Sequence, residues 1–543
     1  MGRPSPRGVL VQLLLLFLLF PALIYPLYML LVRSVSDDEG NFVGAANFLE
    51  YLHSPGLSSS FVHSLTISIT VTALVVPAAF LLAYGLTHTR FSGRRICSLL
   101  VLLPLFVPSL LPAIGFVYLF GSQGIARFLL GGQELYGPLG IVLGNAVFTL
   151  PHATLLLLTS LRSVDSRLYM AAACLGAGPW RKFTSVTLPN ARYGIINASF
   201  VVFTLSITDF GVPKVLGGDY SVLSTEIFSQ VIGQQNLTMG ALISLVLMAP
   251  TVLTLTLDTW ARRAHARLSV QNARPVSNME QKSSPLFGFV CWGILLLPMS
   301  SIAVVVIASF TAFWPYDMTP VLDNYFFEEA GYSLSSLGTS AAMALCAAVF
   351  GTAFLYTGAY LVERAQIPAP LKRLYRLLLL LPLSLPGLVL GLAYIFAFNS
   401  GPFSFLYDSF AILVINTIVH FSTVAHLTFV SALAKVDDNY EKAGRSMGVP
   451  AWKTALRVVV QQCRLPLADV FFYLFINAMT TVSSMAFLCG GRHTVAAISI
   501  VNMYDSGYLG SAAAMSTLVL AVTFGAGLLH VLFKKIVSAE SFE

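Results

Sequence analysis

Leu-Arg-Ser-Val-Asp at residues 161–165, followed by Met-Ala-Ala-Ala-Cys-Leu-Gly-Ala-Gly-Pro-Trp at 170–180, is the most informative part of this sequence, because the chain contains a second copy of it. The second copy reads Leu-Ala-Lys-Val-Asp at 433–437, followed by Lys-Ala-Gly-Arg-Ser-Met-Gly-Val-Pro-Ala-Trp at 442–452. The copies are 272 residues apart (161 to 433) in a chain of 543 residues, so the offset is half the chain. A repeat of this size predicts that the whole protein is one structural unit present twice.

The composition indicates a membrane protein. Hydrophobic residues make up 56% of the chain, charged residues only 10%, and the mean hydropathy is +0.79. Soluble domains carry about 25% charged residues, so a chain this apolar cannot cover a surface that faces water. The net charge of +7 does not indicate nucleic-acid binding, because the basic residues form no stripe with interleaved aromatic residues. The six cysteines show no CxxC pair or metal-ligand spacing, and we expect them to be small core residues.

Apolar stretches of about 20 residues, the length of a membrane-spanning helix, occur six times in each half of the chain. They lie at 9–32, 60–86, 97–120, 137–161, 193–213 and 237–257, and at 286–312, 336–362, 374–397, 409–433, 466–488 and 508–533. The sequence therefore predicts an all-α membrane protein with about 12 transmembrane helices in two six-helix repeats. We expect repeat 1 at residues 1–272 and repeat 2 at 273–543, joined by a polar linker at 259–285.

The distribution of lysine and arginine predicts the orientation in the membrane. With the N-terminus in the cytoplasm, 27 of the 31 basic residues fall in cytoplasmic segments, and only Arg33, Arg127, Lys214 and Arg492 fall outside. Six spans per repeat is an even number, so both repeats have the same orientation, with a pseudo-two-fold axis along the membrane normal. Both termini are expected in the cytoplasm, and the first span is expected to be an uncleaved anchor because its apolar run is too long for a secretory signal.

The duplicated segments, 162–190 and 434–464, are polar and are predicted to lie on the cytoplasmic side. In the first copy a short helix is expected to end at Gly176, and Gly178-Pro179 then turns the chain into a second helical piece at Trp180. Such a pair of short helices is either a compact docking surface for a partner or an ordinary loop between spans. Retention of the glycine and the tryptophan in both copies favours a docking surface.

A second repeated pattern predicts kinked helices. Leu-Leu-Pro-Leu with another proline four residues later gives Pro104/Pro108 in one half and Pro382/Pro386 in the other, and Gly-x-x-Tyr-x-Phe follows at 115–120 and 391–396. A proline within a span bends the helix, because it removes a backbone hydrogen bond. The bend is either a packing feature or part of a pathway that opens and closes.

The duplicated segment resembles the EAA motif of ABC importer permeases, in which Glu-Ala-Ala, three residues and Gly precede Ile-x-Leu-Pro. The matching residues of the first copy are Ala171, Ala172, Gly176, Val186, Leu188 and Pro189. The second copy is looser: it has Ala443, Gly444, Gly448 and Val458, and then Val460 and Gln461 where Leu-Pro is expected. The glutamate positions of the motif are Met170 and Lys442, which puts in doubt a salt bridge at that position. The fused six-plus-six layout is similar to permeases for iron(III), thiamine and phosphonate uptake, and it implies the type I ABC importer permease fold.

The resemblance implies a transport subunit rather than an enzyme, located in a bacterial inner membrane. The chain has no G-x-x-x-x-G-K-[ST] loop for ATP, so the resemblance implies two separate ABC ATPase subunits at the cytoplasmic face, and a periplasmic binding protein that delivers the substrate. No cofactor, metal or nucleic acid is implied. The residues expected to couple to the ATPases are Ala171, Ala172, Gly176, Pro179, Trp180, Arg181, Ala443, Gly444, Gly448, Trp452 and Lys453.

Two further stretches indicate a substrate. Thr208-Asp209-Phe210-Gly211-Val212-Pro213-Lys214 and Asn477-Ala478-Met479-Thr480-Thr481-Val482-Ser483 resemble permeases assigned to 2-aminoethylphosphonate. This zwitterion is the first expectation, and iron(III) or another small solute is the alternative.

Five polar or small residues near the ends of the fifth and eleventh spans are candidates for a translocation pathway. They are Asp209, Gly211, Thr480, Thr481 and Ser483. The alternatives are an interfacial charge for Asp209 and helix-packing hydrogen bonds for the hydroxyls. His152, His420 and His426 lie in spans but form no i,i+4 pair, so no metal site is expected.

A secondary transporter of the six-plus-six type is the rival from a different class. Phe91-Ser92-Gly93-Arg94-Arg95 faintly resembles the loop motif of the major facilitator family, but the expected aspartate and upstream glycine are missing. A membrane enzyme is disfavoured, because no paired carboxylates, nucleophile constellation or metal cluster stands out.

Overall fold

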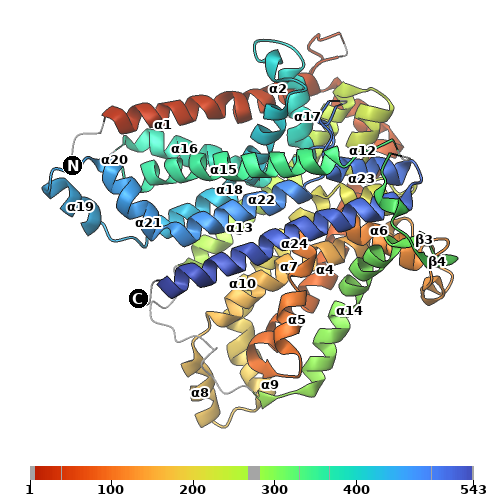
Figure 1. The fold of residues 1–543 in the computed structure, drawn as a ribbon, viewed down its shortest axis with the longest axis horizontal. Coiled ribbons are helices and arrows are strands. Elements are labelled where there is room, and N and C mark those ends of the chain that lie inside the picture. The colour runs from red at the N-terminus through yellow and green to blue at the C-terminus, as the bar shows by residue number, and fades with distance from the viewer. Residues whose placement is uncertain are drawn as a thin grey trace. The chain divides into compact units, whose positions relative to one another are not determined.

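The structure is a computed structural model, and it describes residues 6–540 except 38, 267–281, 329–330, 366 and 491. The expected repeat boundary near residue 272 and most of the linker lie outside the described residues. The chain divides into two compact units (Figure 1). Unit 1 comprises Met1–Ser36, Gly331–Ser499 and Leu518–Glu543, and unit 2 comprises Asp37–Ala330 and Ile500–Thr517.

Unit 2 is built around α4, α7 and α10, which pack against one another. Their shared core consists of branched and small apolar side chains such as Val71, Leu157 and Val202. Pro138 begins α7 and Pro285 begins α14, where a missing backbone N–H leaves no hydrogen bond unmade. The helices of this unit are α3 (Ala46–His53), α4 (Pro55–His88), α5 (Arg94–Leu100), α6 (Leu110–Phe120), α7 (Pro138–Arg162), α8 (Ser166–Cys174), α9 (Pro179–Lys182), α10 (Leu188–Thr208), α11 (Gly211–Leu216), α12 (Leu223–Phe228), α13 (Leu237–Ala266) and α14 (Pro285–Ala308).

Unit 1 has the corresponding core between α15, α18 and α22. Its helices are α1 (Pro6–Leu19), α2 (Tyr25–Ser34), α15 (Ser335–Glu363), α16 (Ala369–Leu380), α17 (Gly387–Phe398), α18 (Phe410–Leu433), α19 (Asn439–Ser446), α20 (Ala451–Thr454), α21 (Val460–Gln462) and α22 (Arg464–Thr480). Helices α23 (Ala496–Asp505) and α24 (Leu509–Glu540) have residues in both units.

The described strands are short and lie between helices. Strand β1 (Thr89–Arg90) pairs in parallel with β2 (Lys282–Ser283), and β3 (Thr311–Phe313) pairs antiparallel with β4 (Asp317–Pro320). The all-α class predicted from the sequence is therefore confirmed.

Each unit contains the first span of the other sequence half. In unit 2, α14 packs against α4 and α6, and a Cβ at Gly115 would collide with the backbone of Ser301 on α14. In unit 1, α2 packs against α17, and the Tyr394 hydroxyl of α17 donates to the carbonyl of Ala22, in the π-helical turn before α2, at 2.5 Å. The compact units therefore do not coincide with the two halves of the sequence. The repeat bounds at 1–272 and 273–543 stay a prediction.

The described part of the chain contains nine helices long and apolar enough to cross a membrane, or up to twelve when each of three bent pairs is one span. Every predicted span overlaps one of these helices or pairs. Two of the bends, of 105° and 114°, fall at the predicted proline positions, after 3₁₀ turns that contain Pro104 and Pro382. The third bend, of 77°, lies between Ala451–Gln462 and Arg464–Thr480.

The repeat also appears as matched local structure. Helices α9 and α20 begin 272 residues apart, at Pro179 and Ala451, and each leads directly into a π-helical turn, Phe183–Thr187 and Ala455–Val459. The backbone leaves the next long helix in an extended conformation at Asp209 in one half and Thr481 in the other. These matched helix starts, π-helical turns and helix ends, all 272 residues apart, show that the two halves share the same local structure here.

Candidate functional site

The first coupling segment, defined as α8, α9 and the turn between them, has the predicted shape. The Asp165 side chain begins α8 by accepting a hydrogen bond from the Arg167 backbone N–H at 2.9 Å. The helix ends at Gly176, whose φ is +72°, and the Ala177 N–H donates back to the Ala172 carbonyl at 2.9 Å. This is the glycine-terminated cap expected from the sequence.

The second coupling segment, defined as α19, α20 and the turn between them, repeats this geometry. Gly448 has a φ of +71°, and the Val449 N–H donates to the Gly444 carbonyl at 2.9 Å. A Cβ at Gly444 would lie 2.6 Å from Oγ1 of Thr454, so glycine lets α19 approach α20 closely. The equivalent position in the first copy is Ala172, which is half-buried.

Each coupling segment is attached to a long helix by a hydrogen bond at equivalent positions. In unit 2 the Tyr169 hydroxyl on α8 contacts Nε2 of His88, at the end of α4, at 3.0 Å, and Oγ1 of Thr187 at 3.0 Å. Burial raises the pKa of Tyr169, so its hydroxyl keeps its proton and can donate. In unit 1 the Tyr360 hydroxyl on α15 donates to Oε1 of Glu441 at 2.9 Å. Residues 88 and 360 share the 272-residue offset, and so do residues 169 and 441.

The anchoring side chains were missed in the sequence. The resemblance placed the glutamate of the motif at Met170 and Lys442, and both of these side chains are exposed. The acid that makes an anchor is Glu441, one residue earlier. Arg364, directly after α15, pairs with Asp438, which precedes α19. The equivalent positions hold a tyrosine (Tyr169) in one copy and a glutamate (Glu441) in the other. A comparison of the two sequences therefore could not reveal that both residues anchor their coupling segment to a long helix.

Both coupling segments expose large apolar side chains. Leu175 and Trp180 are 86% and 75% exposed, and Met447 and Trp452 are 73% and 60% exposed. Ala171, Pro179, Arg181 and Ala443 are also exposed, while Lys453 is half-buried. Apolar groups that water surrounds in this way favour contact with another surface.

The predicted pathway residues lie at matched chain breaks. Asp209 is buried, and its carboxylate accepts a hydrogen bond from the Val212 N–H at 2.8 Å, which places it at the start of α11 beside Gly211. The Asp209 carbonyl accepts from the Ser224 hydroxyl at 2.7 Å. In this structure Asp209, directly after α10, thus bonds to α11 through its carboxylate and to α12 through its backbone carbonyl, while its role in a pathway remains a prediction.

The matched break in unit 1 has hydroxyls instead of a carboxylate. The Thr480 hydroxyl donates to the Ile476 carbonyl at 3.0 Å, within its own helix. Thr481 and Ser484 bond to each other at 2.9 Å, and Ser483 is half-buried. These contacts fit helix packing, and the pathway role of Thr480, Thr481 and Ser483 stays a prediction.

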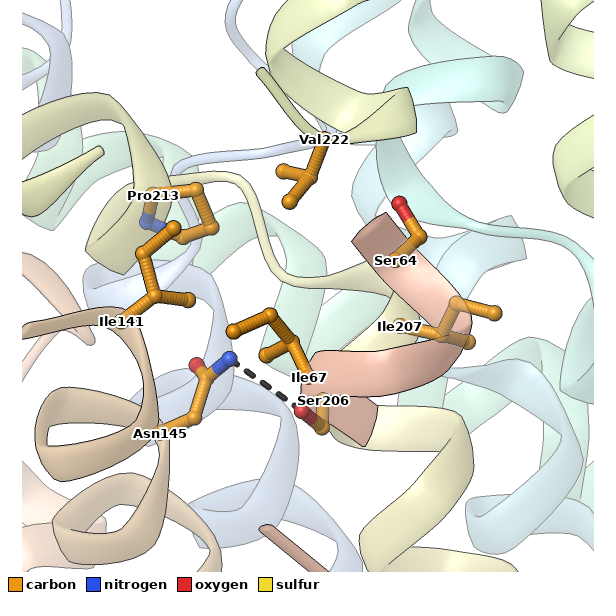
Figure 2. Close-up of a pocket in the computed structure, with 8 residues that line it drawn as sticks. All are labelled: Ser64, Ile67, Ile141, Asn145, Ser206, Ile207, Pro213 and Val222. Carbon is orange, nitrogen blue, oxygen red and sulfur yellow. Dashed lines mark hydrogen bonds between the residues drawn. The ribbon is translucent and has the colours of Figure 1, made fainter. Parts of the chain in front are cut away.

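Unit 2 has a small cavity close to this break (Figure 2). It measures about 10 Å³ and lies among Ser64, Asn145, Ser206 and apolar side chains. The Asn145 amide donates to the Ser206 hydroxyl at 3.2 Å, and its oxygen has no partner among the described residues. This volume is near that of one water molecule, so the cavity cannot hold a transported solute.

An ion pair in unit 2 joins segments of the two sequence halves. The Lys214 ammonium on α11 lies 2.9 Å from the Asp505 carboxylate at the end of α23, and the Tyr504 hydroxyl donates to the Val215 carbonyl at 3.2 Å. Lys214 belongs to residues 208–214, the stretch that resembles permeases assigned to 2-aminoethylphosphonate. The residues around it therefore form a contact between halves.

The three histidines in spans remain apart from other ligands. Within the described ranges, no group of three or more His, Cys, Asp and Glu side chains could hold a metal ion. His152 contacts the Phe148 carbonyl of its own helix at 3.2 Å, and His426 packs edge-on against Tyr375.

Residues 75–270 and 356–538 match the family described as the binding-protein-dependent transport system inner membrane component. The chain is also similar to several transport system permease proteins. A ferric transport system permease protein of Actinobacillus pleuropneumoniae is 26% identical, with 95% of this chain and 76% of that protein covered. A thiamine transport system permease protein of Haemophilus influenzae is 24% identical, with 74% of each chain covered.

A spermidine/putrescine transport system permease protein of Haemophilus influenzae is 26% identical, with 40% of this chain and 82% of that protein covered. Among solved structures, a bacterial alginate ABC transporter in complex with alginate pentasaccharide-bound periplasmic protein contains a similar chain. The TM-score is 0.40 at 19% identity, with 49% of this chain and 94% of that chain covered.

Proposed function

Because the chain belongs to the family of binding-protein-dependent transport system inner membrane components, and is thus an ABC importer permease rather than an enzyme, we propose that its two coupling segments dock two ATPase subunits. The observation that carries this proposal is the repeated exposed surface. Each segment exposes two large apolar side chains at equivalent positions on either side of its capping glycine. They are Leu175 and Trp180 in the first segment, and Met447 and Trp452 in the second. A surface kept in both halves suits a partner that is itself present twice.

The anchors give a route for movement from the ATPases into the membrane. A force on α8 acts on α4 through Tyr169 and His88, and a force on α19 acts on α15 through Glu441 and Tyr360. These are the second spans of their repeats, and both lie in the cores of their units. ATP-driven closure of the two ATPases would move the segments as rigid bodies and switch the access of the pathway.

Two substrates are proposed, each on its own observation. Ferric iron is supported by the ferric permease relative, which aligns along 95% of this chain. 2-Aminoethylphosphonate is supported by the resemblance of residues 208–214 and 477–483. Delivery by a periplasmic binding protein, and the cytoplasmic position of both termini, are parts of the same proposal.

Co-purification of the ATPase tests the docking surface. Leu175→Asp combined with Met447→Asp should abolish recovery of the ATPase with the permease, because each change puts a charge into an apolar contact. Phe128→Asp is the matched control, since Phe128 is 78% exposed and lies outside both segments. Full recovery with the double variant would remove the docking proposal.

Uptake by the complete importer tests the substrate. Labelled ferric iron and labelled 2-aminoethylphosphonate are supplied separately to cells that lack other systems for either solute. Accumulation of one solute identifies it as the substrate. Accumulation of neither would reject both substrates.

A further inference from the structure

A large polar hollow lies in unit 2 at the far end of α4 from the coupling segment. Its volume is about 640 Å³, and its walls are the end of α3, the start of α4, α12 with the following turn, and the start of α13. Helix α4 begins at Pro55 beside the hollow and ends at His88, which bonds to α8. Its 34 residues extend about 50 Å, which exceeds the roughly 30 Å hydrocarbon core of a bilayer. The hollow and the first coupling segment therefore lie on opposite sides of the membrane.

The polar groups that line the hollow are two carboxylates, three amides, two serine hydroxyls and the imidazole of His53, with no lysine or arginine among the described residues. Glu226 is only 8% exposed and Gln230 only 4%, and the Gln230 amide donates to Oε1 of Glu226 at 2.9 Å. Glu50 contributes a second, exposed carboxylate from α3. In the part of the chain that the structure describes, neither carboxylate forms an ion pair.

A carboxylate buried to this extent is unfavourable unless hydrogen bonds or an opposite charge compensate it. The Gln230 amide gives the Glu226 carboxylate one neutral donor and no positive charge. A cation held in the hollow would supply the missing charge, with Glu50 and the Gln234 side chain also in its walls.

The lining favours an organic cation over a bare metal ion. No group of three or more metal-ligating side chains occurs among the described residues, the hollow included. Its volume falls in the range of sites for small organic ligands, about 300–1,000 Å³. An alkylammonium group has three N–H donors, which match carboxylate and amide oxygens.

We propose that this hollow binds the ammonium group of a small solute before the solute enters the membrane. That this solute is a transported substrate rests on the proposed importer function. Of the two proposed substrates, only 2-aminoethylphosphonate carries an ammonium group.

Binding to the full chain in lipid nanodiscs, without ATPase or binding protein, tests the site. The probes are ethanolamine and 2-aminoethylphosphonate, with ethylphosphonate as the matched compound that lacks the amine, and ligand-observed NMR titration gives the Kd. Ethanolamine and 2-aminoethylphosphonate should bind, and ethylphosphonate should not. Glu226→Gln keeps the side-chain shape and should raise the Kd by about tenfold or more, because charge-assisted hydrogen bonds are lost. Glu134→Gln, which neutralises an exposed carboxylate away from the hollow, should leave the Kd unchanged.

The outcomes separate this site from the importer function. If neither amine binds, or if both bind Glu226→Gln as tightly as the native chain, the site is overturned even when uptake by the complete importer is normal. The site is also overturned if Glu226→Gln weakens only the docking of the binding protein. If amine binding depends on Glu226 but no amine is taken up, the site stands and its link to transport fails.

Discussion

Gly176 and Gly448 have left-handed backbones, with φ values of +72° and +71°, and a Cβ at either position would meet nothing within 4 Å. Glycine is therefore required there by the backbone alone, because side chains other than glycine rarely adopt this conformation. Gly178 differs, since it also has open space but its φ is −68°. All three positions have room for a side chain, but only Gly176 and Gly448 have a backbone conformation that requires glycine.

Replacement of Gly176 by alanine should cost about 1–2 kcal/mol at the turn and loosen the end of α8. We expect Gly176→Ala and Gly448→Ala each to lower substrate uptake and to weaken the stimulation of the ATPase by substrate. Gly178→Ala is the matched control and should transport normally. Equal uptake by Gly176→Ala and Gly178→Ala would show that the turn geometry does not matter for coupling.

The bond between Tyr360 and Glu441 can be measured by a double-mutant cycle. Tyr360→Phe and Glu441→Gln each remove part of a hydrogen bond to a charged group, and the coupling free energy should be about 1–2 kcal/mol. The measurement is the free energy of unfolding of the purified protein. Tyr440→Phe, at an exposed neighbouring residue, serves as control. Strictly additive single effects would mean that this bond does not anchor α19.

At the scale of elements, the first span of each sequence half belongs to the compact unit of the other half. Helix α14 completes the core of unit 2 through Cys291 and Leu295, and α1 completes that of unit 1 through Leu15 and Leu19. Within unit 2, Cys291 and Cys97 of α5 are buried in the same core, and their side chains interact. This contact gives a native reporter for the position of α14.

Oxidation with copper phenanthroline should join Cys97 to Cys291 within one chain, because the two side chains interact in the core of unit 2. After the protein is unfolded and alkylated, mass spectrometry should show both cysteines protected, and Cys97→Ser should leave Cys291 free to react. Cys174, which is exposed, should be alkylated in every sample. Continued alkylation of both Cys97 and Cys291 after oxidation would contradict the placement of α14.

At the scale of the whole molecule, the sequence indicates that the chain does not bind ATP through a phosphate-binding loop. No Gly-Lys dipeptide occurs in the sequence, so a phosphate-binding loop with its lysine cannot form. Within the described residues, the two coupling segments present apolar surface instead of a nucleotide site.

The purified chain should therefore hydrolyse no ATP, and in liposomes it should accumulate neither proposed solute on a proton or sodium gradient. Addition of the ATPase and the binding protein should restore uptake that depends on ATP. The assays are phosphate release and labelled uptake. Gradient-driven accumulation by the chain alone would move it to the secondary transporters.

Features that depend on neighbouring residues could be read from the sequence, because hydropathy and turn chemistry act locally. They include the twelve apolar spans, the bends at Pro104 and Pro382, and the turns at Gly176 and Gly448. The exchange of first spans, the pairing of Tyr169 with His88 and the ion pair of Lys214 with Asp505 depend on which distant surfaces meet. No local pattern specifies such contacts, since a span with apolar residues all round can pack against several partners, and only the folded core selects among them.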